Sequence, residues 1–239
     1  MSGFMAVVVG AFLGAGAMGC LAGREVRLDP SVRKGLSGEA TIHVVGYEPI
    51  SALRIVRLGG GVELAQRLAD SFDRFPLEDP VRDVERIFLE GLERELGLGS
   101  ALVVEGPHLG SGHVPAIGAD IESLRAAFGR GLVLDLETFN WQLTFVRRSF
   151  IDNANTTYGL DFSIRARLVR LSDSTILWQG LCSFTRNQGA RPLRELVAED
   201  LKLLKARRTE VAEACAAELL GSFMGRTELS IWSGRNVPR

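Results

Sequence analysis

Residues 158–184 read YGLDFSIRARLVRLSDSTILWQGLCSF, and this stretch decides the fold. From Leu160 to Leu168 every second residue is apolar, and the residues between them are Asp, Ser and Arg. Such alternation is typical of a strand with one buried and one solvated face. Turn-forming residues follow at 172–174, and residues 176–184 again carry apolar side chains on one face. The stretch therefore predicts an antiparallel hairpin.

The segments on either side extend this pattern. Residues 132–145 also alternate, but the apolar parity changes at Phe139, which predicts a bulge or a local twist. Residues 192–221 carry apolar residues at helical spacing, with Pro192 suited to the first turn and Gly221 to the end. We expect one long helix there, packed on the sheet.

The first half of the chain contributes shorter elements. We expect strands at 40–47, 53–58 and 101–105, helices at 62–72, 80–96 and 121–128, and a loop at 106–118. The order of elements predicts an α+β fold: an antiparallel-rich sheet with helices packed on one face and a long C-terminal helix.

Two of the three cysteines fall on apolar faces of this hairpin and helix. Cys182 lies on the apolar side of the second hairpin strand, and Cys215 lies on the apolar stripe of the helix. We expect a disulfide between them, which would stabilise the fold by roughly 3–4 kcal/mol in the chain-entropy model. Two unrelated buried thiols are the alternative.

The start of the chain is apolar and glycine-rich from residue 4 to 18 and continues Ala17-Met18-Gly19-Cys20. Small residues before a cysteine resemble the lipobox of bacterial lipoproteins. The resemblance implies a signal peptide over 1–19, a lipidated Cys20 carrying acyl chains such as palmitate, and a tether over 20–39. A plain signal peptide and an uncleaved anchor are the alternatives.

Lipidation of Cys20 would leave an even pair of cysteines in an oxidising compartment. Leu21 follows Cys20, where inner-membrane lipoproteins often carry Asp, so the resemblance implies the periplasmic face of the outer membrane. We expect a single domain over 40–225 and a tail over 226–239. The net charge of −1 argues against a nucleic-acid partner, which usually requires a basic face.

The C-terminal half carries STILWQGLC at 174–182 and ACAAEL at 214–219. With the preceding strand, these segments resemble uncharacterised proteobacterial lipoproteins, and they are similar in pattern to auxiliary lipoproteins of ABC transporters and to activators of cell-wall synthases. The resemblance implies a membrane-tethered, non-enzymatic adaptor for cell-envelope assembly or transport. A periplasmic small-molecule or lipid binder and a cell-wall hydrolase are the alternatives.

One cluster has the composition of a protein-binding hot spot, because aromatic residues stand beside arginines near a loop. Core packing plus an ordinary loop would give the same composition. The expected partner-binding residues are Trp141, Phe145, Arg147, Arg148 and Phe150.

Other residue patterns are weak signals of chemistry. His108 and His113 lack further ligands between them for a metal, and Gly59–Gly61 lacks the Lys-Ser or Lys-Thr of a phosphate-binding loop. Asp135 and Glu137 could form a catalytic carboxylate pair, although an arginine-paired strand face is commoner. The SxxK match at Ser31 lies in the expected tether. We therefore expect no enzyme activity, cofactor or metal.

Overall fold

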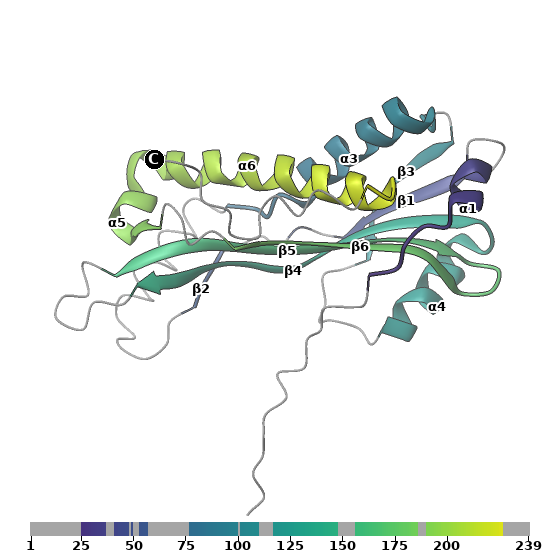
Figure 1. Ribbon diagram of the computed structural model, residues 1–239. Helices are drawn as coiled ribbons and strands as arrows, with labels where there is room; N and C mark the ends of the chain where they lie inside the picture. Colours follow the sequence, from purple (N-terminus) through teal and green to yellow (C-terminus); the bar gives the residue numbers. More distant parts are fainter. Residues whose placement is uncertain are drawn as a thin grey trace, which may run out of the picture.

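The computed structural model describes residues 25–36, 41–47, 49, 53–56, 77–99, 101–109, 117–147, 156–185 and 190–226. The described strands form a long sheet, and the helices pack against it (Figure 1). They are α1 (Pro30–Leu36), β1 (Ile42–Tyr47), β2 (Arg54–Val56), α3 (Val81–Leu96), β3 (Leu102–Leu109), α4 (Ile117–Phe128), β4 (Leu132–Arg147), β5 (Thr157–Arg170), β6 (Thr175–Thr185), β7 (Arg191–Pro192), α5 (Leu193–Leu196) and α6 (Ala198–Phe223).

The sheet combines a parallel part with an antiparallel part. Its strand order is β3-β1-β4-β5-β6, with β2 paired to β4 and β7 paired to β5. The pairs that β1 forms with β3 and β4 are parallel, whereas β4–β5 and β5–β6 are long antiparallel pairs. The predicted α+β class, the antiparallel-rich sheet and the long C-terminal helix are confirmed.

The hairpin and the bulge are both present. Turn residues Leu171 to Ser174 connect β5 to β6, and Ser174 adopts a φ of 57°. The register between β4 and β5 shifts between Thr138 and Asn140. This shift confirms the bulge that the parity change predicted, and it keeps Trp141 on the same face as Leu136.

The larger hydrophobic core lies between the sheet and two helices. Figure 1 shows α3 and α6 above the strands, and their buried residues join one cluster with the inward residues of β4, β5 and β6. A second, smaller cluster lies on the opposite face, where Ile121 and Leu124 of α4 pack on Val45, Val133 and Val169. The prediction that the helices pack on one face is therefore wrong for α4.

The expected tether is wrong for residues 25–36, which belong to the folded domain. Val26 forms an antiparallel bridge with Gln179, and Leu28 and Leu36 are buried. The Asp29 carboxylate accepts hydrogen bonds from the backbone N–H and the hydroxyl of Ser31 and so begins α1. Residues 20–24 and 37–40 lie outside the described part.

Helix α3 begins and ends as its sequence predicts. The Asp79 carboxylate accepts a hydrogen bond of 3.0 Å from the Val81 N–H. Gly97 has a φ of 67°, in the left-handed region, and its N–H donates to the Glu93 carbonyl. Both ends therefore have the partners that a helix terminus needs.

The long C-terminal helix is interrupted near its start. α5 ends at Leu196, and residues 199–201 within α6 have φ between 49° and 61°. The expected continuous helix from Pro192 is therefore wrong for this first turn. Leu193 and Leu196 before the break and Leu201 after it are all buried, so the apolar stripe continues across the break and does not reveal it.

One further expectation differs from the structure, and two others concern residues that it does not describe. The expected loop at 106–118 is shorter, because β3 runs to Leu109 and α4 begins at Ile117. The expected helix at 62–72 lies outside the described residues. The same holds for the C-terminal tail beyond Arg226.

Candidate functional site

The Cys182–Cys215 disulfide is present and joins β6 to α6, 33 residues apart in the sequence. The two Cα atoms are 5.4 Å apart, within the usual range for a disulfide. Both cysteines are buried in the larger core. The predicted pairing is confirmed, and it links the outer strand of the hairpin to the helix that covers it.

Trp141 does not lie on the surface. Its side chain is 1% exposed, and its ring packs edge-on against Phe162 with the centroids 5.9 Å apart. The indole N–H donates a hydrogen bond of 3.0 Å to the Leu77 carbonyl. Trp141 therefore belongs to the core and cannot contact a partner directly, because the bulge after Thr138 turns it inward.

The rest of the predicted hot spot lies at the far end of β4. Phe145 and Arg147 stand on the strand opposite Tyr158 and Thr157 of β5; their side chains lie outside the described part. Arg148 and Phe150 follow the strand and also lie outside it. Their role in partner binding stays a prediction.

A buried ion pair crosses β4 and β5 on the sheet face that carries α4. Asp135 stands opposite Arg167 in the register, and their side chains are 1% and 0% exposed. Arg167 Nε donates to Asp135 Oδ1 at 3.0 Å, and its Nη2 donates to Oδ2. Tyr47 of β1 donates a further hydrogen bond of 3.1 Å to Oδ2. Three strands are thereby joined through one carboxylate.

A second ion pair lies two residues further along the same strands. Arg165 Nη2 donates to Glu137 Oε2 at 2.6 Å, and the Arg165 guanidinium stands over the Phe139 ring, 4.9 Å from its centroid. The guanidinium is thus held by a charge on one side and a ring face on the other. The arginine-paired alternative for Asp135 and Glu137 is confirmed, because an arginine binds each carboxylate.

A polar triplet follows on the same strand face beyond the bulge. Asp161 of β5 accepts a hydrogen bond from the Gln142 amide of β4 at 3.1 Å. Its other oxygen accepts one from the Thr185 hydroxyl of β6 at 3.1 Å. The ion pairs and this triplet form a row that cross-links neighbouring strands. The sequence signal for the two ion pairs is the acidic residues at alternate positions of 135–137 and the arginines at alternate positions of 165–167.

Other residues with possible chemistry have structural surroundings. The Ser31 hydroxyl is exposed on α1 and donates to Asp29 at 2.5 Å, as a capping serine does. The His43 ring packs against Phe128 of α4, with centroids 5.2 Å apart. Among the described residues, no group of three potential metal ligands is present. The side chain of His108, all of His113 and Gly59–Gly61 lie outside them.

Among the described residues, four carboxyl groups have shifted pKa values. The side-chain hydrogen bond from Ser31 is the main cause that lowers the pKa of Asp29. The hydrogen bond from the Arg170 side chain is the main cause that lowers the pKa of Asp173 to about 2. Burial raises the pKa of Glu85. Burial, and then the neighbouring charge of Glu25, raise the pKa of Glu218 on α6.

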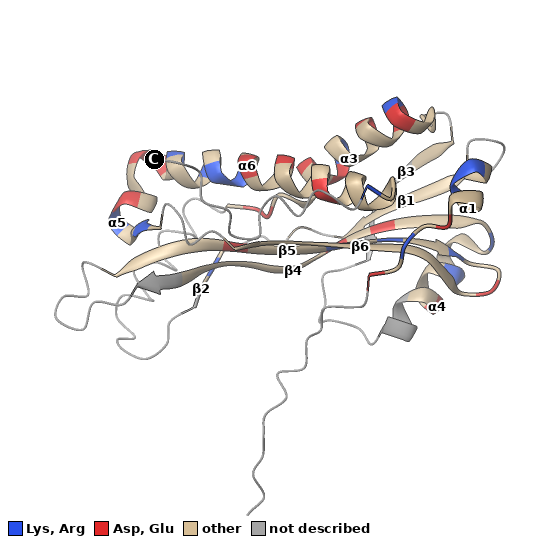
Figure 2. Ribbon diagram, in the orientation of Figure 1, with Lys and Arg blue, Asp and Glu red and all other residues tan. Residues whose placement is uncertain are grey.

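The outer side of α6 carries interspersed charges of both signs (Figure 2). Lys202, Lys205 and Arg207 form ion pairs with acidic residues of the same helix. The solvent-facing side of α6 therefore presents a mixed surface, with no strong single-sign field.

None of the helices in the described part combines the length and apolarity needed to cross a membrane.

Comparison with known proteins gives no family. No family model matches the chain, and none of the curated proteins matches it.

Several solved structures match with low scores. PelC from Paraburkholderia phytofirmans, a dodecamer, is 12% identical at a TM-score of 0.31; the match covers 84% of this chain and 95% of that one. Protein XCC0632 from Xanthomonas campestris is 13% identical at 0.32, with 84% and 95% covered. Lipoprotein GNA1162 from Neisseria meningitidis is 17% identical at 0.24, with 73% and 99% covered.

Proposed function

We propose that this chain is a lipid-anchored protein of the bacterial cell envelope that binds another envelope protein without catalysing a reaction. The observation that carries the proposal is the disulfide between Cys182 and Cys215. The chain has three cysteines, so the disulfide leaves Cys20 as the remaining thiol. Cys20 follows a short apolar run and small residues, the position at which a lipoprotein is acylated.

The disulfide also supports the compartment. Disulfides of this buried, structural type persist in oxidising surroundings such as the bacterial periplasm and are rare in the cytosol. Export and acylation would place the folded domain on the periplasmic side. The residue after Cys20 is Leu21, and we assign the outer membrane on that basis. Several acyl chains at about 0.8 kcal/mol for each buried methylene would make a firm anchor.

The contact region proposed for the partner is the end of the β4–β5 pair. Phe145 and Arg147 stand near the end of β4, and Arg148 and Phe150 follow in the connection to β5. The cross-linked row of Asp135, Arg167 and their neighbours lies on the same two strands and would keep this end rigid. Arginines and aromatic residues on a rigid support are typical of binding hot spots.

The anchor is tested by the intact mass of protein purified from membranes in detergent. Cleavage before Cys20, added acyl chains and the loss of two hydrogens for one disulfide should all be visible in one spectrum. Cys20→Ser should abolish acylation. An unchanged protein whose mass shows an uncleaved N-terminus and no acyl chain would show a plain anchor and overturn the proposal.

The partner region is tested by crosslinking in intact cells, followed by purification and mass spectrometry. Arg147→Ala with Arg148→Ala should abolish a specific crosslinked partner. The control is Arg86→Ala on α3, which removes an exposed arginine whose side chain is 59% exposed and should leave the partner unchanged. An identical set of partners for all three proteins would contradict the assignment of this region.

A further inference from the structure

Strand β6 forms one edge of the sheet and has few features that would prevent pairing with another strand. Its eleven residues, Thr175–Thr185, contain no charged residue and no proline. Natural proteins guard open edges with such residues, because unpaired backbone N–H and C=O groups invite pairing with another strand. Among the described residues, Val26 alone pairs with the outer side of β6. A strand edge of this composition is suited to pairing with a further strand.

The Val26 bridge fixes which β6 residues point outward. Val26 and Gln179 exchange both backbone hydrogen bonds, at 3.1 and 2.9 Å. Backbone groups along a strand alternate between its two neighbours, and the register of β6 with β5 runs without a shift from Gln179 to Thr185. Leu181, Ser183 and Thr185 consequently direct their N–H and C=O groups away from β5, toward the open edge.

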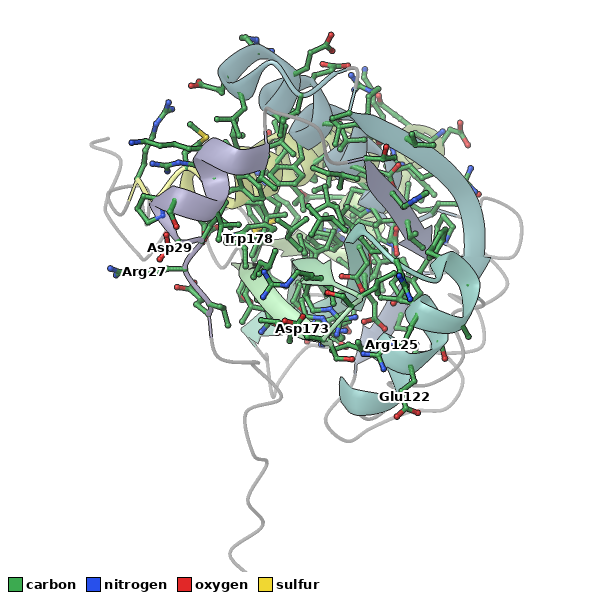
Figure 3. All side chains as sticks on the ribbon, turned by 90° about the vertical axis from the view of Figure 1, so that its right-hand side faces the viewer. Arg27, Asp29, Glu122, Arg125, Asp173 and Trp178 are labelled. Carbon is green, nitrogen blue, oxygen red and sulfur yellow. A yellow bond between two sulfur atoms is a disulfide. The ribbon has the colours of Figure 1, made fainter. Side chains whose placement is uncertain are left out.

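The chain itself supplies a strand in the right place and direction. The pairing at Val26 is antiparallel, so residues before Val26 run along β6 toward Thr185. Figure 3 shows the N-terminal segment, with Arg27 and Asp29, beside the strand that carries Trp178. We propose that residues 20–24 continue this pairing, with Arg24 opposite Leu181, Ala22 opposite Ser183 and Cys20 opposite Thr185.

Side-chain placement agrees with this register. Residues opposite each other in a sheet point to the same face, so Glu25 would share the face of Gly180, toward α6. The charge of Glu25 acts on Glu218 of α6, as that placement requires. By the same alternation Leu21 would lie beside Phe184 of the core, and the polar Arg24 would lie on the other face.

The docked strand would hold the lipid close to the fold. Cys20 lies six positions before Val26, a span of at most about 20 Å, and pairing of this segment to β6 would fix Cys20 beside the end of that strand. This consequence rests on the proposed function, because it requires acylation at Cys20. The β6 edge would then lie next to the membrane, and the domain would have one defined orientation on it.

The test is amide hydrogen exchange of the protein purified in detergent, after its intact mass has established the N-terminus. The amides of Leu181 and Ser183 should be protected. Ala22→Pro removes an N–H that points to β6 and should speed their exchange by about tenfold or more. Gly23→Pro is the matched control, because the Gly23 N–H would point away from β6 and a proline is tolerated there.

The amides of Gly180 and Cys182 bond to β5, so they should stay protected in every variant and report that the sheet is intact. Rapid exchange of Leu181 and Ser183 in the unchanged protein would overturn the proposal. Protection that depends on protein concentration and ignores Ala22→Pro would also overturn it, because a second copy would then cover the edge. Neither outcome would alter the mass that reports acylation, so failure of the lipid anchor stays distinguishable.

Discussion

The guanidinium of Arg167 on β5 binds the carboxylate of Asp135 on β4 through two of its nitrogens, and neither side chain has more than 1% of its surface exposed. Two charges taken out of water lose hydration worth several kcal/mol each, and their attraction balances that loss only with good geometry and further hydrogen bonds. The facing register and the Tyr47 hydroxyl supply both. The pair is thus stable as a unit and costly to break.

Removing one partner should therefore destabilise the fold strongly. We expect Asp135→Asn and Arg167→Met each to lower the free energy of unfolding by about 3–5 kcal/mol, since each leaves a buried polar group without its match. The double variant should lose at least about 1 kcal/mol less than the sum of the two. Urea unfolding measures all three.

The exposed Arg170–Asp173 pair is the matched control, with side chains 45% and 48% exposed. Asp173→Ala should change the free energy of unfolding far less than either buried variant does, because solvent screens the pair. Additive effects of Asp135→Asn and Arg167→Met would show that the two residues do not act together.

The Cys182–Cys215 disulfide should contribute about 3–4 kcal/mol to the free energy of unfolding, from the 33-residue separation of the two cysteines. The variant with both cysteines changed to alanine should unfold at lower urea than the oxidised protein and should not respond to reducing agent. Cys20→Ser should retain full stability and full sensitivity to reducing agent. An equal stability of oxidised and reduced protein would mean that the bond does not constrain the unfolded chain.

The sheet could be predicted because apolar and polar residues alternate along its strands, as they do in a strand with one buried face. Alternation in β5 and the parity change in β4 were sufficient to place the hairpin and the bulge. The position of α4 on the second face was missed. Its signal was Val169, which makes both faces of the end of β5 apolar beside Leu168 and Leu171. A strand that is apolar on both faces is covered on both.

The predictions for the N-terminal segment and for Trp141 in the hot spot were wrong for different reasons. Few apolar residues occur at 25–36, so composition suggests a tether, while the backbone bridge from Val26 to Gln179 leaves no trace in side-chain pattern. Trp141 looked like part of a surface hot spot because aromatic residues serve both cores and interfaces. Its partner, the Leu77 carbonyl, is 64 residues away in the chain, and only the fold brings the two together.

Gly180 of β6 should not tolerate a side chain. A Cβ there would lie 2.5 Å from the Trp178 ring and 3.0 Å from a Leu219 methyl. Trp178 cannot give way easily, because it is fully buried and its ring packs against Phe88 and Phe223. We expect Gly180→Ala to lower the free energy of unfolding by about 1–3 kcal/mol, as overpacking of a core does.

Gly35 in α1 is the control for Gly180, because a Cβ there would meet nothing within 4 Å. Gly35→Ala should leave the stability unchanged or raise it by up to about 1 kcal/mol, from better helix propensity. Both variants are compared by thermal unfolding. Equal midpoints for the two variants would show that the core near Trp178 adapts to the extra atom.

Glu218 should destabilise the folded protein at neutral pH. Burial first, and then the charge of Glu25, raise its pKa in the folded state above the ordinary value of 4.5, so the folded state binds its proton more tightly than the unfolded state does. The stability that the protonated Glu218 side chain contributes is present below pH 4.5 and is lost as the pH rises through the raised pKa.

Glu218→Gln, which carries no charge at any pH, should therefore unfold at higher urea than the unchanged protein at pH 7, and the difference should disappear as the pH falls below about 4.5. The exposed Glu213 on the same helix supplies the control, and Glu213→Gln should leave the urea midpoint nearly unchanged at both pH values, because an exposed carboxylate loses little hydration on folding. A Glu218→Gln protein less stable than the unchanged protein at pH 7 would show instead that the carboxylate is stabilised where it lies.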